Sequence, residues 1–174
     1  MATRLLVLSD THLPTRAKVL PDLLWPEIEA ADLVVHAGDW VSGELLDELA
    51  ARSRRLVACY GNNDGPDLRA RLPLVDRAVV EGVRLAVVHE TGPARKREER
   101  MDEQFPDTDL LIFGHSHIPW DSVTPRGMRL LNPGSPTDRR RQPFCTYLRL
   151  EIDGETLTPS LQRLPPRQAG RPVR

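Results

Sequence analysis

Seven side chains that can bind metal ions each follow a short apolar segment of this 174-residue chain. They are two aspartates, one asparagine and four histidines, namely Asp10, His12, Asp39, Asn62, His89, His115 and His117. One histidine at the end of a strand is more often hydrogen-bonded structure than a ligand, but chance explains seven such positions poorly. Imidazole with carboxylate favours transition-metal ions, and the absence of cysteine from the set argues against a structural zinc site.

The apolar segments that precede these residues predict the strands that must position them. Each segment is short, continuous and rich in β-branched residues, which is typical of a strand buried on both faces. The segments are 5–8, 33–35, 56–58, 85–88 and 110–113. The spacing between successive ligand-bearing turns fits about one crossover unit each. Because ligands in α/β proteins gather beyond the carboxyl ends of parallel strands, we expect all five turns at one edge of one sheet.

The rest of the chain predicts helices in the first two thirds and antiparallel strands toward the end. Helices are expected over 22–30, short or irregular because of Trp25-Pro26, over 43–52 with Ser42 as N-cap, from Gly65-Pro66 to before Pro73, and over 95–105. Hairpins are expected around the turns at 81–82, 125–127 and 153–154. The antiparallel strands need a surface to cover and the βαβ half offers one, so we expect two sheets face to face with helices outside.

Length and composition indicate one domain over 1–164, followed by a Pro- and Arg-rich tail over 165–174 that we expect to be flexible. A net charge of −1 without a basic stripe argues against a long nucleic-acid partner. No apolar run approaches membrane-spanning length, so no membrane partner is expected. The two separated cysteines, Cys59 and Cys145, predict reduced thiols in a cytoplasmic protein. A homo-oligomer is compatible with the sequence.

The order Asp-x-His, Gly-Asp, Gly-Asn-x-Asp, His, Gly-His-x-His resembles that of the calcineurin-like metallophosphoesterase superfamily, and most closely its small prokaryotic phosphodiesterase branch. The likeness runs from Asp10 to about Pro143 and includes the stretch Asn-Pro-Gly-Ser-Pro-Thr-Asp-Arg over 132–139. It implies an α/β fold, a four-layer α/β/β/α sandwich of two mixed sheets flanked by helices. It also implies hydrolysis of phosphodiesters, with phosphomonoesters as a further option, by in-line attack of a hydroxide that bridges two divalent ions. Mn²⁺ is the first expectation for these ions, with Ni²⁺, Fe and Zn²⁺ as alternatives.

The resemblance also implies roles for single residues. One ion is expected on Asp10, His12 and His117, the other on Asn62, His89 and His115, and Asp39 is expected to bridge them. Asp39, Asn62, Asn63 and Asp64 are the residues expected to take part in catalysis. Asn63 stands where many members of the superfamily have a histidine that acts as general acid, and an amide cannot donate a proton at neutral pH. Asp64 is expected either to orient a ligand or to close its turn.

Four further features lie outside this ligand set. Glu90 replaces the glycine that is usual in the branch, and we expect it to point to solvent. His36 lies within its strand and is expected in the core rather than on a metal. Asn132 is expected to pin the loop behind the metals through its amide. The run 139–141 of three arginines could reach a substrate phosphate, although a charge run is usually a solvated face.

The alternative to an enzyme is a non-catalytic interaction scaffold, like the metallophosphoesterase-like subunit of the retromer coat. The intact set of seven ligands disfavours that alternative. A small phosphoester is therefore the expected substrate, and its identity stays open at this point.

Overall fold

The structure is a computed structural model, and it describes residues 1–166. Its strands are β1 Thr3–Leu8, β2 Leu33–His36, β3 Leu56–Ala58, β4 Val75–Val80, β5 Val83–Val88, β6 Leu110–Ile112, β7 Trp120–Val123, β8 Arg129–Asn132, β9 Thr146–Asp153 and β10 Thr156–Arg163. Its helices are α1 Leu24–Ala30, α2 Gly43–Arg52, α3 Pro66–Arg71 and α4 Arg97–Gln104. Of the expected tail, only Pro165 and Pro166 belong to the described residues.

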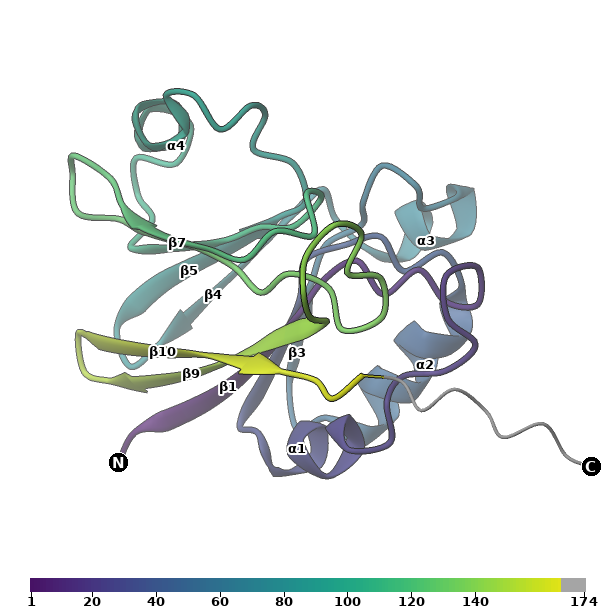
Figure 1. Ribbon diagram of the computed structural model, residues 1–174. Helices are drawn as coiled ribbons and strands as arrows, with labels where there is room; N and C mark the ends of the chain where they lie inside the picture. Colours follow the sequence, from purple (N-terminus) through teal and green to yellow (C-terminus); the bar gives the residue numbers. More distant parts are fainter. Residues whose placement is uncertain (167–174) are drawn as a thin grey trace, which may run out of the picture.

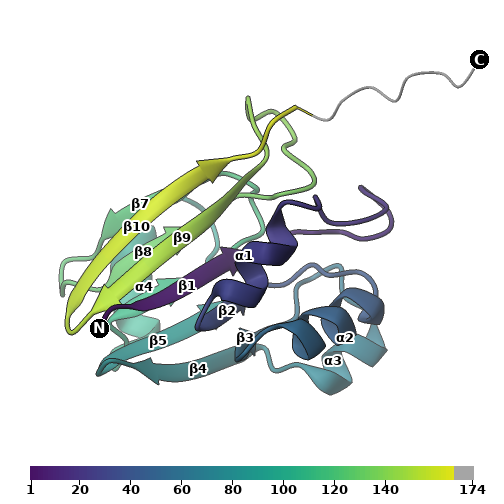
Figure 2. The same ribbon diagram turned by 90° about the horizontal axis from the view of Figure 1, so that it is seen from below.

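Two five-stranded mixed sheets pack face to face (Figure 1). The first has the order β10-β9-β1-β2-β3, and the second has the order β4-β5-β6-β8-β7. In the view of Figure 2, α1, α2 and α3 lie along the outer side of the first sheet. Helix α4 covers the outer side of the second sheet (Figure 1). The expected four-layer α/β/β/α sandwich is therefore confirmed.

Alternation along each strand divides the core into three layers. On β1, Leu5 and Val7 face the second sheet and pack with Leu85 and Ile112 between the sheets. The intervening Leu6 and Leu8 face outward and pack against α1 and α2. A separate cluster holds α4 on the second sheet through Met101 and Phe105. Strands buried on both faces carry few polar residues, so polar side chains that could bind a metal ion lie in the loops that follow these strands.

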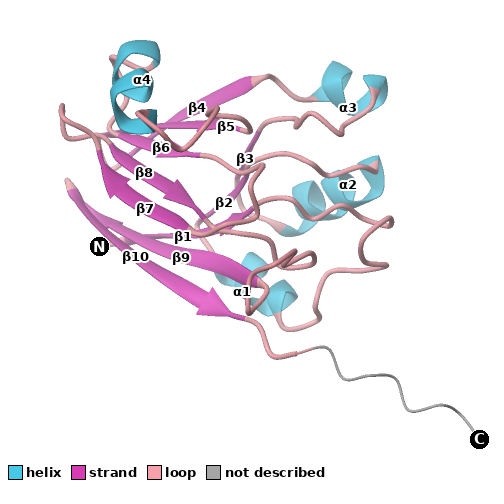
Figure 3. Ribbon diagram, turned by 45° about the horizontal axis from the view of Figure 1, so that its top comes forward, coloured by secondary structure: helices cyan, strands magenta, loops and turns pink. Residues whose placement is uncertain are grey.

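The prediction that all five ligand-bearing strands share one sheet is wrong. Strands β1, β2 and β3 run parallel in the first sheet, whereas β5 and β6 run parallel in the second. After α3 the chain crosses to the second sheet and enters it through the β4–β5 hairpin. The carboxyl ends of both strand sets nevertheless meet at one end of the sandwich, where the loops gather (Figure 3). The site is therefore assembled between two sheets rather than along one.

We had expected the antiparallel strands to form a sheet of their own, and this prediction is wrong. All three hairpins are present, but β9 pairs with β1 and brings β10 into the first sheet. Buried positions on both faces at the start of β9 allow it to lie beside β1 in the middle of the sheet. Ser42 occupies the N-cap position of α2 as expected, but its side chain makes no capping hydrogen bond.

No helix in residues 1–166 has the length and apolar character needed to cross a membrane.

Candidate metal centre

The loops that end the ligand-bearing strands have an unusual backbone. Asp10, His12, Asp39, His115 and His117 all adopt the left-handed conformation, with φ between 46° and 74°. A residue with a Cβ is rare there, and the conformation costs roughly 1 kcal/mol or more. Such strain concentrates at functional sites, where the surrounding structure holds it in place.

Three atoms of the expected ligands form a compact triangle. His12 Nε2 lies 3.2 Å from His117 Nε2, and Asp10 Oδ1 lies 3.8 Å and 3.4 Å from these two nitrogens. A point about 2 Å from all three atoms exists, which is the usual length of a bond from a zinc-like ion to nitrogen or oxygen. His117 Nδ1 donates to the carbonyl of Asp138 at 2.5 Å, which leaves the lone pair of Nε2 free for a metal ion.

Asp10 has a buried carboxylate oxygen that suits a cation. Its Oδ2 accepts hydrogen bonds from the Ser9 hydroxyl at 2.6 Å and from the His115 backbone N–H at 3.0 Å. Its Oδ1 is buried and has no hydrogen-bond partner within residues 1–166. Burial raises the pKa of Asp10, but His117 and His12 lower it by more, so the carboxylate is ionised. A buried, charged oxygen without a donor is costly unless a cation neutralises it.

A second group of ligand atoms surrounds His89. Its Nε2 lies 3.0 Å from Asn62 Oδ1 and 3.3 Å from Asp39 Oδ2. The same Asn62 oxygen lies 3.0 Å from His115 Nδ1. His89 Nδ1 donates to the carbonyl of Ala37 at 2.6 Å, so Nε2 is the nitrogen that faces the group. Asn62 and Asp39 come from the first sheet and both histidines from the second.

Asp39 faces both groups. Its Oδ2 lies 3.4 Å from His12 Nε2 and 3.3 Å from His89 Nε2. Burial raises the pKa of Asp39, but the hydrogen bond and the charge of His89, with the hydrogen bonds from Asn63, outweigh burial and lower this pKa to about 2. Burial lowers the pKa of His89, and the bond to Asp39 with the charge of Asp10 raises it to about 8. A divalent cation between these groups would take the place of the proton that His89 carries.

Asn63 holds Asp39 rather than standing free beside the site. Its backbone N–H donates to Asp39 Oδ1 at 2.9 Å, and its side-chain amide donates to Asp39 Oδ2 at 2.7 Å. The amide therefore fixes the plane of the carboxylate that faces both ligand groups.

Asp64 joins the turn after β2 to the turn after β3. Its carboxylate accepts backbone hydrogen bonds from Asp39 at 3.0 Å, Val41 at 2.8 Å and Gly61 at 2.7 Å. The sequence left two interpretations of Asp64 open, namely that it orients a ligand and that it closes its turn. These three bonds support both interpretations. The three bonds set the backbone from which the Asp39 side chain projects.

Sequence reasoning missed two glycines that let the loops approach one another. A Cβ at Gly61 would overlap Asp39 Oδ1, and a Cβ at Gly114 would overlap Ser9 Oγ. Both glycines stand directly before a ligand in the motifs. Their position in the motifs was the signal that could have identified these glycines. The residues that they approach, Asp39 and Ser9, lie far away along the chain.

Asn132 pins the loop behind the site, as expected. Its side-chain amide donates to the carbonyl of Gly114 at 3.0 Å, and its Oδ1 accepts from the N–H of Gly134 at 2.9 Å. The sequence did not indicate Ser135, whose hydroxyl donates to the carbonyl of Asp10 at 2.8 Å. The stretch over 132–139 therefore fixes the loops that carry ligands from both sheets.

The centre is open to solvent at His115. His115 has a side chain 49% exposed, and Asn62 and Asn63 are exposed beside it, whereas the other expected histidine ligands are buried. Glu90, expected to point to solvent, is 54% exposed, but its Oε1 lies 3.5 Å from His115 Nδ1. It therefore brings negative charge to the mouth of the site. Arg140 donates to the carbonyl of His115 at 3.3 Å from the same side.

His36 is a core residue, as expected. Its ring stacks on Trp40 with the ring centroids 3.6 Å apart. Its Nδ1 accepts from the N–H of Gly38 at 3.2 Å, and its Nε2 lies 3.1 Å from Thr11 Oγ1. Burial lowers the pKa of His36 to about 3, so the ring is neutral in the folded protein.

Replacement of His36 by glutamine should flatten the dependence of stability on pH. Between the ordinary pKa of 6.5 and the folded value of about 3, the unfolded chain binds a proton that the folded protein does not. Wild-type stability should therefore fall as the pH falls through this window, by up to about 1.4 kcal/mol per pH unit from this group alone. Glutamine does not titrate and should remove this contribution. Urea unfolding of both proteins from pH 7 to pH 4 measures it. Parallel curves would show that His36 is protonated normally.

Comparisons with known proteins show the family and the fold of the chain. The model of a family described as the calcineurin-like phosphoesterase superfamily domain matches residues 3–155. A Methanothermobacter thermautotrophicus protein named "Probable metallophosphoesterase" is 33% identical over 162 residues, which cover 90% of each chain. The solution structure of a Thermotoga maritima protein is similar at 32% identity, with a TM-score of 0.75 over 93% of this chain and 99% of that one. Wild-type Vps29 from Entamoeba histolytica, crystallised with Zn²⁺, has a TM-score of 0.75 at 22% identity over 93% and 98% of the two chains. That last likeness shows the fold alone.

Proposed function

Because the chain belongs to the calcineurin-like phosphoesterase superfamily, we propose that it hydrolyses phosphodiester bonds with the help of two divalent metal ions. The observation that carries the proposal is the position of Asp39 Oδ2, between His12 of one ligand group and His89 of the other. Asp10 Oδ1, which is buried without a hydrogen-bond partner in the described residues, supports a cation in the first group.

The residues present suit such ions. Asp10, His12 and His117 would hold the first, Asn62, His89 and His115 the second, and Asp39 would contact both. When bound, a pair of divalent ions neutralises charge on the phosphate and makes a water molecule nucleophilic at neutral pH. Mixed oxygen and imidazole ligands suit Mn²⁺, Ni²⁺, Fe and Zn²⁺, and Mn²⁺ is the ion that we propose first.

The protein contributes orientation and charge. The carbonyls of Ala37 and Asp138 accept from Nδ1 of His89 and His117, which fixes both rings with Nε2 toward the ions. Asn63 holds the Asp39 carboxylate, and its amide cannot act as a general acid. The leaving oxygen must therefore depart as an anion or take its proton from solvent, which favours esters with acidic leaving groups.

Charge at the mouth favours diesters over monoesters. A monoester phosphate carries close to two negative charges at neutral pH, because its second pKa is about 6, whereas a diester carries one. The Glu90 carboxylate, 3.5 Å from His115 Nδ1, would repel the dianion more strongly. A small phosphodiester is therefore the proposed substrate class.

Removal and return of metal tests the proposal. We expect the chelated protein to be inactive toward bis(p-nitrophenyl) phosphate and to regain activity as about two equivalents of Mn²⁺ bind. Activity toward p-nitrophenyl phosphate should be lower. Elemental analysis with parallel rate measurements gives both quantities. Saturation at one ion would contradict the dinuclear centre. Binding of two ions without hydrolysis of either ester would favour the non-catalytic scaffold.

A further inference from the structure

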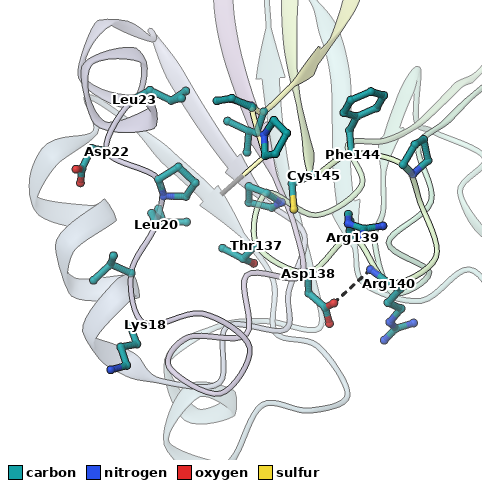
Figure 4. A pocket seen from close by; sticks show the side chains of 17 residues that line it. Lys18, Leu20, Asp22, Leu23, Thr137, Asp138, Arg139, Arg140, Phe144 and Cys145 are labelled. Carbon is teal, nitrogen blue, oxygen red and sulfur yellow. Dashed lines mark hydrogen bonds between the residues drawn. The ribbon is translucent and has the colours of Figure 1, made fainter. Parts of the chain in front are cut away.

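A large cavity lies beside the metal centre. It has a volume of about 1160 Å³ and lies between the loop over 18–23 and the loop over 136–145, with residues 164–166 at its edge. Figure 4 shows Lys18, Leu20 and Leu23 on one wall and Asp138, Arg140 and Phe144 on the other. Neither wall carries any of the seven expected metal ligands.

One wall of the cavity is nevertheless part of the metal centre. Asp138 lines the cavity, and its carbonyl accepts the hydrogen bond from His117 Nδ1. Arg140 also lines it and donates to the carbonyl of His115, the ligand at the open mouth. The backbone N–H of Arg140 donates to the Asp138 carboxylate at 3.3 Å, which ties the two wall residues together (Figure 4). Arg140 therefore contacts both the mouth of the metal centre and the cavity.

The lining combines apolar surface with positive charge. Its apolar lining residues include the buried Leu20 and Leu164 and the exposed Leu23 and Phe144. Its charged lining residues in the described part of the chain are three cations and two anions, namely Lys18, Arg139, Arg140, Asp22 and Asp138. Asp138 also has a cationic neighbour outside the lining, since its Oδ2 lies 3.6 Å from Arg16 Nε. An apolar pocket with a few charged groups suits an organic anion that carries a ring.

We infer that this cavity binds the ester group that stays on phosphorus, and that this group is a nucleoside or an organic ring of similar size. The inference rests on the proposed function. In this arrangement the phosphate lies at the metal centre, Arg140 pairs with one of its oxygens, and the ring lies between Leu23 and Phe144. A guanidinium suits this position because its donors match phosphate oxygens in pairs.

Three diesters with one leaving group test the inference. They are the p-nitrophenyl esters of thymidine 5′-phosphate, methyl phosphate and phosphocholine, so that only the retained group differs. We expect kcat/KM for the thymidine ester to exceed that for the methyl ester by about 10-fold or more. The phosphocholine ester should be the poorest, because its cation meets Lys18, Arg139 and Arg140.

Matched variants locate the effect. Leu23→Trp should fill the cavity and raise KM for the thymidine ester by about 10-fold, with little change for the methyl ester. Leu161→Trp is the control, since Leu161 lies on β10 outside the cavity lining and is 43% exposed, against 42% for Leu23. Arg140→Gln should raise KM for all three esters, whereas Arg141→Gln, one residue beyond the lining, should not.

A binding measurement separates failure of this inference from failure of the proposed function. Thymidine 5′-monophosphate, the expected product, should bind the metal-loaded wild-type protein and bind the Leu23→Trp variant about 10-fold more weakly, whether or not turnover occurs. Equal affinities, or equal substrate preferences in the wild type and Leu23→Trp, would overturn the inference even if all three diesters were hydrolysed. Binding with the expected difference but without hydrolysis would uphold the cavity and refute the enzyme.

Discussion

Asp39→Asn is expected to lower kcat/KM for a phosphodiester by at least about 100-fold. Loss of a residue that merely orients a ligand typically costs about 10- to 100-fold, and this change weakens a contact to both ligand groups at once. Asp39 Oδ2 lies within 3.4 Å of His12 Nε2 and 3.3 Å of His89 Nε2. Asparagine removes the charge while tolerating the left-handed backbone, where φ is 59°.

Comparison with two other variants sharpens this result. His117→Asn alters only the first ligand group, so excess Mn²⁺ should restore much of its activity, whereas Asp39→Asn should not recover. Asp107→Asn removes an exposed carboxylate far from the ligands and should behave as the wild type. Rates measured across a range of metal concentrations, with the metal content of each protein, give the comparison. Near-normal turnover of Asp39→Asn at low metal concentration would show that Asp39 does not bridge.

Gly61→Ala is expected to destabilise the fold and to displace Asp39. The added methyl group would overlap the Asp39 carboxylate and the backbone nitrogen of the same residue. Overpacking of this kind costs about 1–3 kcal/mol in the free energy of unfolding. Because the overlapped residue is an expected ligand, metal affinity should fall as well.

Gly65→Ala is the matched control, four residues along the same loop. No described atom lies within 4 Å of a Cβ built there, and its φ of −75° is open to any residue. Urea unfolding and Mn²⁺ titration of both variants should show the two losses in Gly61→Ala alone. Equal behaviour of the two variants would mean that the loop adjusts without disturbing Asp39.

The sequence predicted features that depend on neighbours along the chain. The hairpin at Glu81-Gly82 followed from turn residues between two apolar runs, and the grouping of the expected ligands followed from polar residues at strand ends. The division into two sheets could not be predicted this way. A crossover within one sheet and a passage to a second sheet need similar lengths of chain, so the interval between Asn62 and His89 did not distinguish them.

The supporting contacts were harder to foresee. Asp138 accepts from His117 through its main-chain carbonyl, which any residue type could provide. Gly61 is required by Asp39, which lies 22 positions earlier and is reached only in the folded chain. The cavity is formed by two segments without regular structure, and no periodic pattern reports their proximity.

The division of the ligands between the sheets has a thermodynamic consequence. The first group of expected ligands joins Asp10 and His12, after β1, to His117, after β6, and the second joins Asn62, after β3, to His89 and His115. Each bound ion would act as a cross-link between the two halves of the sandwich. Ions that bind the folded chain alone shift the unfolding equilibrium by mass action, by about 2.7 kcal/mol at a free concentration of 100 times Kd. The melting temperature would then be set by the free-ion concentration around the protein as well as by its core.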